Sequence, residues 1–468
     1  MEHFIGRKDE LKKLEEFYNG TKYKACSILG RRRIGKTTLI DEFVKDKDCL
    51  RIQFLDSTFD ANMELLNMTM GEYLEREVKY SNTLEFFSDL AGYINGRKVV
   101  IVFDEFPYMI DCDETFPSVT QHFMDRQMGD SKLIICGSSV KTMEHEIGDY
   151  SRPLYGRTWE IRMEEMPISD CMQFHPGLSD GDQLKLYLTT GGIPLYCDVP
   201  KFDDYDDYVK KNILEPNSYF SREGEAMVER ELSPKSKYIK ILDAMRGRRN
   251  TINTISSRTG IDRDTCSDCL KKMIELKMVG VTEPIFGAPM KPKYFEIRDN
   301  MLAFHFMAKR RVPVRNGNPE GMLKAIRPMM STEHGFMFEN YCRNLIAKSY
   351  PVRAIGTWWG SGPRTDRWGN INPDDVIEYD IDVAAEIVSG FNIVYLAVEC
   401  KYTDHPVGFS VLNELDSSIG CLKNKRDVRR MIMAPSGFDD DLAEYAAENG
   451  ILLVGLDMLL EKEPMPEI

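Results

Sequence analysis

The chain has 468 residues, 42% of them hydrophobic and 29% charged, with a formal net charge of −14. This balance is typical of folded globular proteins and excludes a disordered or fibrous chain. At roughly 100–200 residues per domain, the length predicts about two to four domains. Residues 235–330 hold 20 Lys and Arg against 9 Asp and Glu, and both flanking segments are acidic. The acidic whole argues against unspecific coating of nucleic acid, whereas the basic segment predicts one local surface for anions.

The longest apolar runs, Val99–Phe103, Ile393–Val398 and Ile451–Leu456, have the length of buried strands. They are far shorter than the ~20 residues of a membrane helix, and the charged first residues predict no signal peptide. Eleven cysteines are scattered along the chain without a disulfide pattern, which indicates reduced thiols. We therefore expect a cytoplasmic protein that does not contact a membrane.

In the first third of the chain, apolar strands alternate with amphipathic helices. Strands are predicted at residues 23–29, 50–55, 99–103 and 132–136, and helices at residues 37–45, 62–78 and 119–128. This alternation predicts βαβ units, and therefore an α/β fold with a mostly parallel sheet.

A glycine-rich loop follows the first of these strands and fits the pattern GxxxxGK[ST]. Its candidate nucleotide-binding residues are Gly30, Arg31, Arg32, Arg33, Ile34, Gly35, Lys36, Thr37 and Thr38. Glycines let the backbone N–H groups of such a loop point at phosphate oxygens, and the N-terminus of the following helix adds partial positive charge. We expect Lys36 to reach the β- and γ-phosphates of ATP and Thr37 to ligate Mg²⁺.

The third strand, VVIVFDEF, ends on Asp104 and Glu105. A buried strand beside the loop would bring Asp104 to the Mg²⁺ ion, and Glu105 could orient or deprotonate the attacking water. The two motifs together predict ATP binding. They are a weaker sign of hydrolysis, because proteins that only bind a nucleotide can keep both.

Three further features follow in chain order. IICGSS ends a strand with Ser138, which could sense the γ-phosphate; PLYGR would place Arg157 in reach of the same sheet edge; and GGIP follows a helix at residues 191–194. Each of them alone also fits a helix cap or a solvated side chain.

The chain resembles archaeal-type ATPases, a family similar to the STAND branch of the AAA+ class. The motifs that carry the resemblance are, in chain order, FIGRKDELKKLEEFY, the glycine-rich loop, VVIVFDEF, IICGSS, PLYGR and GGIP. The resemblance covers about residues 1–230. It implies a RecA-like core at residues 1–165 and a helical lid at 166–234, with Ser138 as sensor 1 and Arg157 as a phosphate-sensing arginine. Pro107, directly after DEF, departs from the family and is expected to shorten the strand.

The basic segment, residues 235–330, is predicted to form a winged helix and a linker. Three short helices, a turn at Gly260 and two apolar strands are predicted, with residues 262–276 as the recognition-type helix. Exposed cations would face the phosphates of double-stranded DNA, namely Arg263, Lys271 and Lys272 on that helix and Lys291 and Lys293 on the wing. The alternative is a winged helix that only packs against neighbouring domains.

Residues 331–468 contain a cluster of carboxylates. Asp380 and Asp382 lie on one predicted strand, Glu399 and Lys401 on the next, and a short turn at residues 389–392 makes the two strands antiparallel neighbours. Side chains alternate with a period of two, so Asp382, Glu399 and Lys401 should share one face. Two carboxylates suit Mg²⁺ or Mn²⁺, and the lysine could position a hydrolytic water. The alternative is a salt-bridged surface hairpin.

This D…ExK arrangement resembles the PD-(D/E)xK nuclease fold, and in particular the domain of uncharacterised function that follows such archaeal ATPases. TWW at residues 357–359 and ECK at 399–401 carry the resemblance. It implies a restriction-endonuclease-like α/β domain with Asp382 and Glu399 as metal ligands, Lys401 as a catalytic residue and Glu339 as an additional acidic residue. Asp380 stands where the family has Glu.

Two functions follow. The first is an ATP-hydrolysing protein that acts on DNA and has a metal-dependent nuclease site. The second is an ATP-switched regulator of the STAND type, whose nuclease-like domain binds without cleaving. A homo-oligomer is compatible with both. A small-molecule kinase fits poorly, because nothing after the glycine-rich loop would hold an acceptor.

Overall fold

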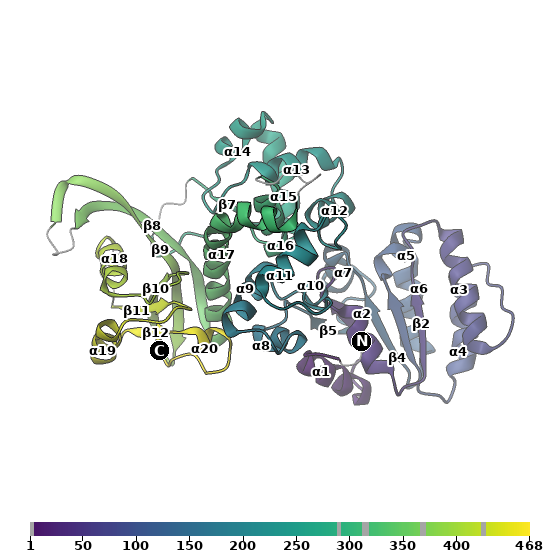
Figure 1. The fold of residues 1–468 in the computed structure, drawn as a ribbon. Helices are drawn as coiled ribbons and strands as arrows, with labels where there is room; N and C mark the ends of the chain where they lie inside the picture. Colours follow the sequence, from purple (N-terminus) through teal and green to yellow (C-terminus); the bar gives the residue numbers. More distant parts are fainter. Residues whose placement is uncertain (1–3, 288–291, 311–317, 366–370, 423–426) are drawn as a thin grey trace. The chain divides into compact units, whose positions relative to one another are not determined.

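The computed structural model describes residues 4–287, 292–310, 318–365, 371–422 and 427–468 (Figure 1). Its chain divides into two compact units. Unit 1 comprises Met1–Phe174 and Ile193–Asp198, and unit 2 comprises His175–Gly192 and Val199–Ile468. Lys291, predicted on the wing, lies outside the described residues. In the part of the chain that is described, no helix is both long and apolar enough to cross a bilayer.

Unit 1 contains a parallel sheet with the strand order β2-β3-β4-β1-β5. Its strands are β1 (Ala25–Leu29), β2 (Cys49–Gln53), β3 (Val100–Asp104), β4 (Lys132–Cys136) and β5 (Thr158–Arg162). The central strands β1, β3 and β4 are buried along their whole length, which explains why they are mostly apolar. The predicted α/β fold with a parallel sheet is confirmed. Because β1 lies between two strands that follow it in the chain, the loop after β1 opens at a switch point of the sheet.

The helices of unit 1 cover this sheet. They are α1 (Lys8–Asn19), α2 (Lys36–Val44), α3 (Phe59–Leu74), α4 (Thr83–Ile94), α5 (Phe106–Cys112), α6 (Phe116–Arg126), α7 (Val140–Gly148), α8 (Ile168–Cys171), the 3₁₀ turn η1 (Met172–Phe174) and α10 (Pro194–Cys197). Figure 1 shows α3 and α4 side by side, and their buried faces join the core around Phe87, Phe103 and Phe116. The prediction missed α4. Pro107 does not disturb β3, because it lies in the first turn of α5, where a missing N–H is harmless.

The first part of unit 2 is helical. It contains α9 (Asp180–Thr190), α11 (Tyr205–Tyr208), the π-helix η2 (Val209–Leu214), α12 (Glu223–Glu231), α13 (Lys235–Ala244), α14 (Ile252–Thr259), α15 (Arg263–Glu275), β6 (Val279–Val281), β7 (Phe295–Ile297), α16 (Asn300–Lys309) and α17 (Pro319–Ser349). Helices α13 to α15 and the antiparallel pair β6–β7 share one core, which includes Ile241, Ile255 and Phe295. These are the elements predicted for residues 235–298; their assignment to a winged helix stays a prediction.

The second part of unit 2 is built on a mixed sheet with the order β12-β11-β10-β9-β8. Its elements are β8 (Val352–Thr365), β9 (Ile371–Ser389), β10 (Asn392–Cys400), α18 (Phe409–Gly420), β11 (Val428–Met433), α19 (Asp440–Asn449), β12 (Leu452–Val454) and α20 (Leu456–Leu459). Strands β8, β9 and β10 are antiparallel, and β10, β11 and β12 are parallel. The hairpin β8–β9 is long, and residues 383–389 of β9 pair with β10 (Figure 1).

The domain border predicted at residue 330 falls inside a helix. Helix α17 runs from Pro319 to Ser349 and includes Pro328. A proline within a helix removes one backbone hydrogen bond and does not always end it. The change of charge near residue 330 therefore marks no break in the backbone, and the division of the chain into four domains stays a prediction.

Candidate functional site

The glycine-rich loop connects β1 to α2 and depends on two glycines. Gly35 has φ of +91°, a left-handed conformation that a side chain would strain. A Cβ atom on Gly30 would lie 2.9 Å from the carbonyl oxygen of Met163, too close for any residue but glycine. Lys36 begins α2 and is buried. Its Nζ donates hydrogen bonds of 2.7 and 3.0 Å to the carbonyl oxygens of Gly30 and Arg31, and burial lowers its pKa.

The other residues of the loop are held by unit 1 itself. Arg31 lies 3.7 Å from Glu165, and Arg33 donates a 3.1 Å hydrogen bond to the hydroxyl of Tyr196 in α10, two residues after the GGIP turn. Ile34 is buried, whereas Thr37 is exposed and Thr38 half-buried. The candidate phosphate loop therefore combines a fixed backbone with the open hydroxyl of Thr37.

Asp104 lies at the end of β3, directly beside the first turn of α2. Its Oδ2 accepts a 3.3 Å hydrogen bond from the Thr37 hydroxyl and a 2.7 Å bond from the guanidinium of Arg51 in β2. The Cys136 thiol lies 3.0 Å from Oδ1, and burial raises the pKa of that thiol. The hydroxyl of Thr37 and the carboxylate of Asp104 are hard oxygen donors and fit a magnesium ion.

The prediction missed Arg51. Because β2 is the neighbour of β3, Arg51 lies in register with Val102, two residues before Asp104. It also contacts Asp41 in α2. The sequence does mark Arg51 as a charged residue within an otherwise apolar strand, CLRIQ. Its partner Asp104 could not be predicted, because Asp104 belongs to a different strand.

Glu105 follows Asp104 in a left-handed conformation with φ of +51°. A positive φ is uncommon for a non-glycine residue and marks a position held by its surroundings. Its Oε2 accepts hydrogen bonds of 2.9 Å from both the backbone N–H and the hydroxyl of Ser138, at the end of β4. Arg32 lies 3.4 Å from the Ser138 hydroxyl and 3.1 Å from that of Tyr108. Glu105, Ser138 and Arg32 thus meet at the edge of the sheet where the glycine-rich loop opens.

Arg157 does not reach this edge, and the prediction of its place is wrong. It precedes β5, whose first residue Thr158 pairs with Ala25 at the start of β1, whereas the glycine-rich loop follows the end of β1. In a parallel sheet the two ends of the strands face opposite ways, so Arg157 lies at the amino edge. There it contacts Asp125 at 3.4 Å and the carbonyl oxygen of Pro153 at 3.2 Å.

The carboxylates of the C-terminal sheet come together as the strand pattern predicts. Strands β9 and β10 pair antiparallel, and the last pair, Val383 opposite Val398, directly precedes Asp382 and Glu399. Asp382 Oδ2 accepts a 2.9 Å hydrogen bond from the backbone N–H of Cys400. Lys401 Nζ lies 2.8 Å from Glu399 and 3.2 Å from Glu414.

The charges of this cluster act on one another. Burial, and then the neighbouring charge of Asp382, raise the pKa of Glu399 to about 8. Burial and the charge of Asp382 also raise the pKa of Asp380. Burial disfavours the ammonium group of Lys401, but the carboxylates of Glu399 and Glu414 outweigh it and raise its pKa. The raised pKa values of Glu399 and Asp380 mean that these carboxyl groups resist ionisation. A cation bound beside them would be stabilised by their negative charge.

Glu339 in α17 joins the cluster through an arginine rather than directly. The guanidinium of Arg248 contacts Glu339 and lies 3.7 Å from Asp382 Oδ1, and Arg249 lies 2.6 Å from Asp380. Within the described ranges, no three His, Cys, Asp or Glu side chains stand close enough to hold a metal ion. The carboxylate oxygens of this cluster are donors of the kind that a hard cation prefers, but the guanidinium of Arg248 lies among them.

Much of the basic segment is engaged inside unit 2. The arginines with internal acidic or carbonyl partners are Arg248, Arg249, Arg258, Arg298 and Arg310. Arg263, Lys271, Lys272 and Lys293 are exposed, and Lys271 lies 3.1 Å from Asp268 on its own helix. The excess of positive charge in residues 235–330 therefore serves partly to neutralise acids of the same unit.

The part of the chain that contains the glycine-rich loop matches a known protein family. Residues 4–197 match an ATPase domain found predominantly in Archaea. An uncharacterized protein of Methanocaldococcus jannaschii is 27% identical over 379 residues, which cover 78% of this chain and 83% of that protein. An uncharacterized ATP-binding protein of the same organism is 44% identical over 48 residues, 10% of this chain and 81% of that protein.

Among the solved structures that are similar at low identity are the following two. A Walker-type ATPase of Pyrococcus abyssi has a TM-score of 0.49 and 17% identity, covering 65% of this chain and 96% of that one. The ORC2 protein of Aeropyrum pernix has a TM-score of 0.46 and 11% identity, covering 71% of this chain and 97% of that one.

Proposed function

Since residues 4–197 match the ATPase domain family found predominantly in Archaea, we propose that unit 1 binds ATP with Mg²⁺ and hydrolyses it. The observation that carries the proposal is the meeting of Lys36, Thr37 and Asp104 at the carboxyl edge of a parallel sheet, with the Thr37 hydroxyl 3.3 Å from the Asp104 carboxylate. Glycine-rich loops at such an edge hold phosphates through backbone N–H groups and the helix N-terminus.

Each residue of the proposed site has a separate task. Lys36 exchanges its bonds to the loop carbonyls for the β- and γ-phosphates, which are better acceptors because they are charged. Thr37 and Asp104 would hold Mg²⁺, which neutralises charge on the phosphates when it is bound. Arg51 donates to the same oxygen of Asp104 as Thr37 and thereby holds that carboxylate in position.

Glu105 is the residue we assign to the attacking water. A carboxylate near the γ-phosphate can orient the water or accept its proton. Its two hydrogen bonds from Ser138 fix the direction of the carboxylate, which supports a positioning role for Ser138.

A Glu105→Gln variant should bind ATP with wild-type affinity and hydrolyse it at least about 100-fold more slowly, because an amide cannot accept the proton of the water. Turnover is measured by phosphate release and binding by calorimetry with ATP and Mg²⁺. Glu114→Gln, an exposed glutamate of the same unit, serves as the matched control. Wild-type turnover in Glu105→Gln would remove this residue from the reaction.

A second proposal concerns DNA. The exposed cations Arg263, Lys271 and Lys272 on α15 support contact with the phosphates of double-stranded DNA. The arginines with internal partners, Arg248, Arg249, Arg258, Arg298 and Arg310, are less available for this contact.

Neutralising Arg263, Lys271 and Lys272 together should weaken DNA binding. The dependence of the affinity on salt should fall by ~0.9 unit for each phosphate that these side chains neutralise. The measurement is fluorescence anisotropy of labelled duplex DNA over a series of salt concentrations. The matched control neutralises Lys8, Lys12 and Lys13, exposed cations of α1. Equally weakened binding in both triple variants would show a general charge effect and exclude α15 as the DNA surface.

We further propose that unit 2 carries a nuclease-type site at Asp382, Glu399 and Lys401, which uses Mg²⁺ or Mn²⁺. Support comes from the two carboxylates on adjacent strands and the lysine 2.8 Å from Glu399. The alternative, a STAND-type regulator with a binding domain that does not cleave, is favoured by the arginine that lies among these carboxylates.

Two broader proposals accompany these. Eleven free thiols, most of them buried, support a cytoplasmic location. Assembly of the chain into a homo-oligomer stays a prediction, which light scattering with and without ATP would test.

A further inference from the structure

The loop between α13 and α14 directs two adjacent arginines at the acidic cluster of the C-terminal sheet. Arg248 contacts Glu339 and lies 3.6 Å from Glu296 and 3.7 Å from Asp382. Arg249 lies 2.6 Å from Asp380 and 3.6 Å from Glu378. Three carboxylates from β7, α17 and β9 thus surround a single guanidinium, although these elements are far apart in the sequence.

Several contacts fix the path of this loop. The side-chain oxygen of Asn250 accepts a 2.9 Å hydrogen bond from the Arg246 N–H, and its amide group donates to Gly247 at 2.9 Å and to Phe295 at 3.1 Å. Gly247 has φ of +63°, and a Cβ atom there would lie 3.3 Å from the ring of Phe336. Both features favour glycine at this position.

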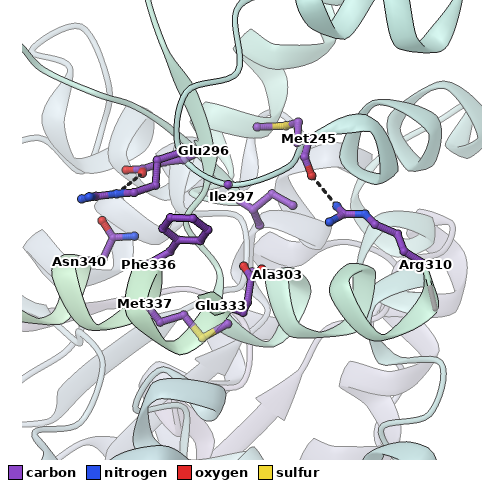
Figure 2. Close-up of a pocket in the computed structure, with 11 residues that line it drawn as sticks. Met245, Glu296, Ile297, Ala303, Arg310, Glu333, Phe336, Met337 and Asn340 are labelled. Atoms are coloured by element: carbon purple, nitrogen blue, oxygen red, sulfur yellow. Dashed lines mark hydrogen bonds and ion pairs between the residues drawn. The ribbon is translucent and has the colours of Figure 1, made fainter. Parts of the chain in front are cut away.

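A small pocket lies under the loop, and residues of the loop, of α16 and of α17 line it (Figure 2). Arg310 reaches from the end of α16 to the carbonyl oxygen of Met245, and Figure 2 shows Phe336 and Met337 of α17 among the residues that line the pocket. Burial in this pocket raises the pKa of Glu333 to about 7. The loop is thus tied to the helix that also carries Glu339.

A guanidinium keeps its charge at any physiological pH. Arg248 therefore places a permanent positive charge between Glu339 and Asp382, and its side chain is only 17% exposed. A divalent cation bound by Asp382 would stand within a few ångströms of that charge. Like charges at such a distance repel strongly where little water screens them.

We propose that Arg248 is a built-in competitor for the metal ion of the C-terminal site. It holds Asp382 and Glu339 in an ion pair, so that a divalent cation binds there only when the loop 246–250 withdraws. This inference rests on the proposed nuclease-type function of the site and names how that site is regulated.

The test is a calorimetric titration of the whole chain with Mn²⁺ alone. Arg248→Gln should bind Mn²⁺ at least about tenfold more tightly than the wild type, because the competing charge is gone. Adding Asp382→Asn to Arg248→Gln should remove that gain. Arg249→Gln is the matched control and should change the affinity less, since Arg249 contacts only the outer carboxylates.

Arg248→Gln leaves buried carboxylates without a partner and could prevent folding, so a second measurement uses the wild-type chain. By linkage, metal binding must weaken the contacts that oppose it. Mn²⁺ should therefore increase hydrogen exchange in residues 246–250 of the wild type.

The outcomes separate the inference from the proposed function. Equal Mn²⁺ affinity in wild type and Arg248→Gln, abolished in both by Asp382→Asn, would overturn the competition and leave the metal site standing. Mn²⁺ binding to the wild type without a change of exchange in the loop would overturn it as well. If neither protein binds Mn²⁺ through Asp382, both the inference and the metal site fall.

Discussion

A Lys36→Ala variant should lose affinity for ATP by at least about 100-fold, because one ammonium makes charge-assisted hydrogen bonds worth about 1.5–3 kcal/mol each to the phosphates. In the free protein Lys36 is buried and bonded to the carbonyl oxygens of Gly30 and Arg31, so its removal also takes a donor from the free loop. Calorimetry with ATP and Mg²⁺ measures the loss.

The matched control is Lys45→Ala at the other end of the same helix. Lys45 is 64% exposed and pairs with Glu42 on the surface, so its removal should leave nucleotide affinity unchanged. The melting temperature of both variants separates loss of binding from loss of the fold. Wild-type affinity in a folded Lys36→Ala protein would contradict the nucleotide site at the end of β1.

The sequence was sufficient for the parts of the molecule that local pattern controls. The central strands β1, β3 and β4 of unit 1 are mostly apolar because both faces of a parallel sheet are covered, and they lie where the apolar runs predict them. The pairing of β9 with β10 followed from the short turn at residues 389–392 and the alternation of side chains. These two local signals are enough to bring Asp382 and Glu399 together.

Most of the predictions that failed concern residues whose positions depend on contacts between distant segments of the chain. Arg157 was assigned to the wrong edge because the sequence does not state whether a residue before one strand lies at the same end of the sheet as a residue after another. The long strand β8 was missed since its apolar content is broken by glycines. Helix α4 is an exception: it was missed although Asn82 caps it and its buried residues Phe86, Phe87, Leu90 and Ile94 recur at helical spacing. Arg51 and Arg248 find their acidic partners on other strands and helices, far along the chain, where no spacing rule reaches.

The acidic cluster yields the other large expected effect. Asp382→Asn should abolish metal binding at the C-terminal site and reduce phosphodiester cleavage at least about 1,000-fold, because a hydrolytic metal contributes several kcal/mol to the transition state. The amide keeps an oxygen for the N–H of Cys400, whose hydrogen bond to Asp382 measures 2.9 Å, so the fold should persist. The assay is Mn²⁺-dependent cleavage of plasmid and branched DNA, with and without ATP.

Two variants sharpen this result. Lys401→Ala should keep the metal and lose the rate, since the lysine acts on the water and not on the cation. Asp404→Ala, which removes an exposed carboxylate nearby, should change neither.

A readout independent of metal also exists for Asp382→Asn. The charge of Asp382 contributes to the raised pKa of Glu399, about 8, so the variant should lower that pKa, as carboxyl NMR would detect. If Glu399 titrates unchanged, the two side chains do not share a site. If it shifts but no DNA is cut in any nucleotide state by the wild type or by Arg248→Gln, the paired carboxylates serve binding alone. The chain is then the ATP-switched regulator, in which Arg248 keeps the C-terminal domain bound to its neighbour within unit 2 rather than shielding a catalytic metal.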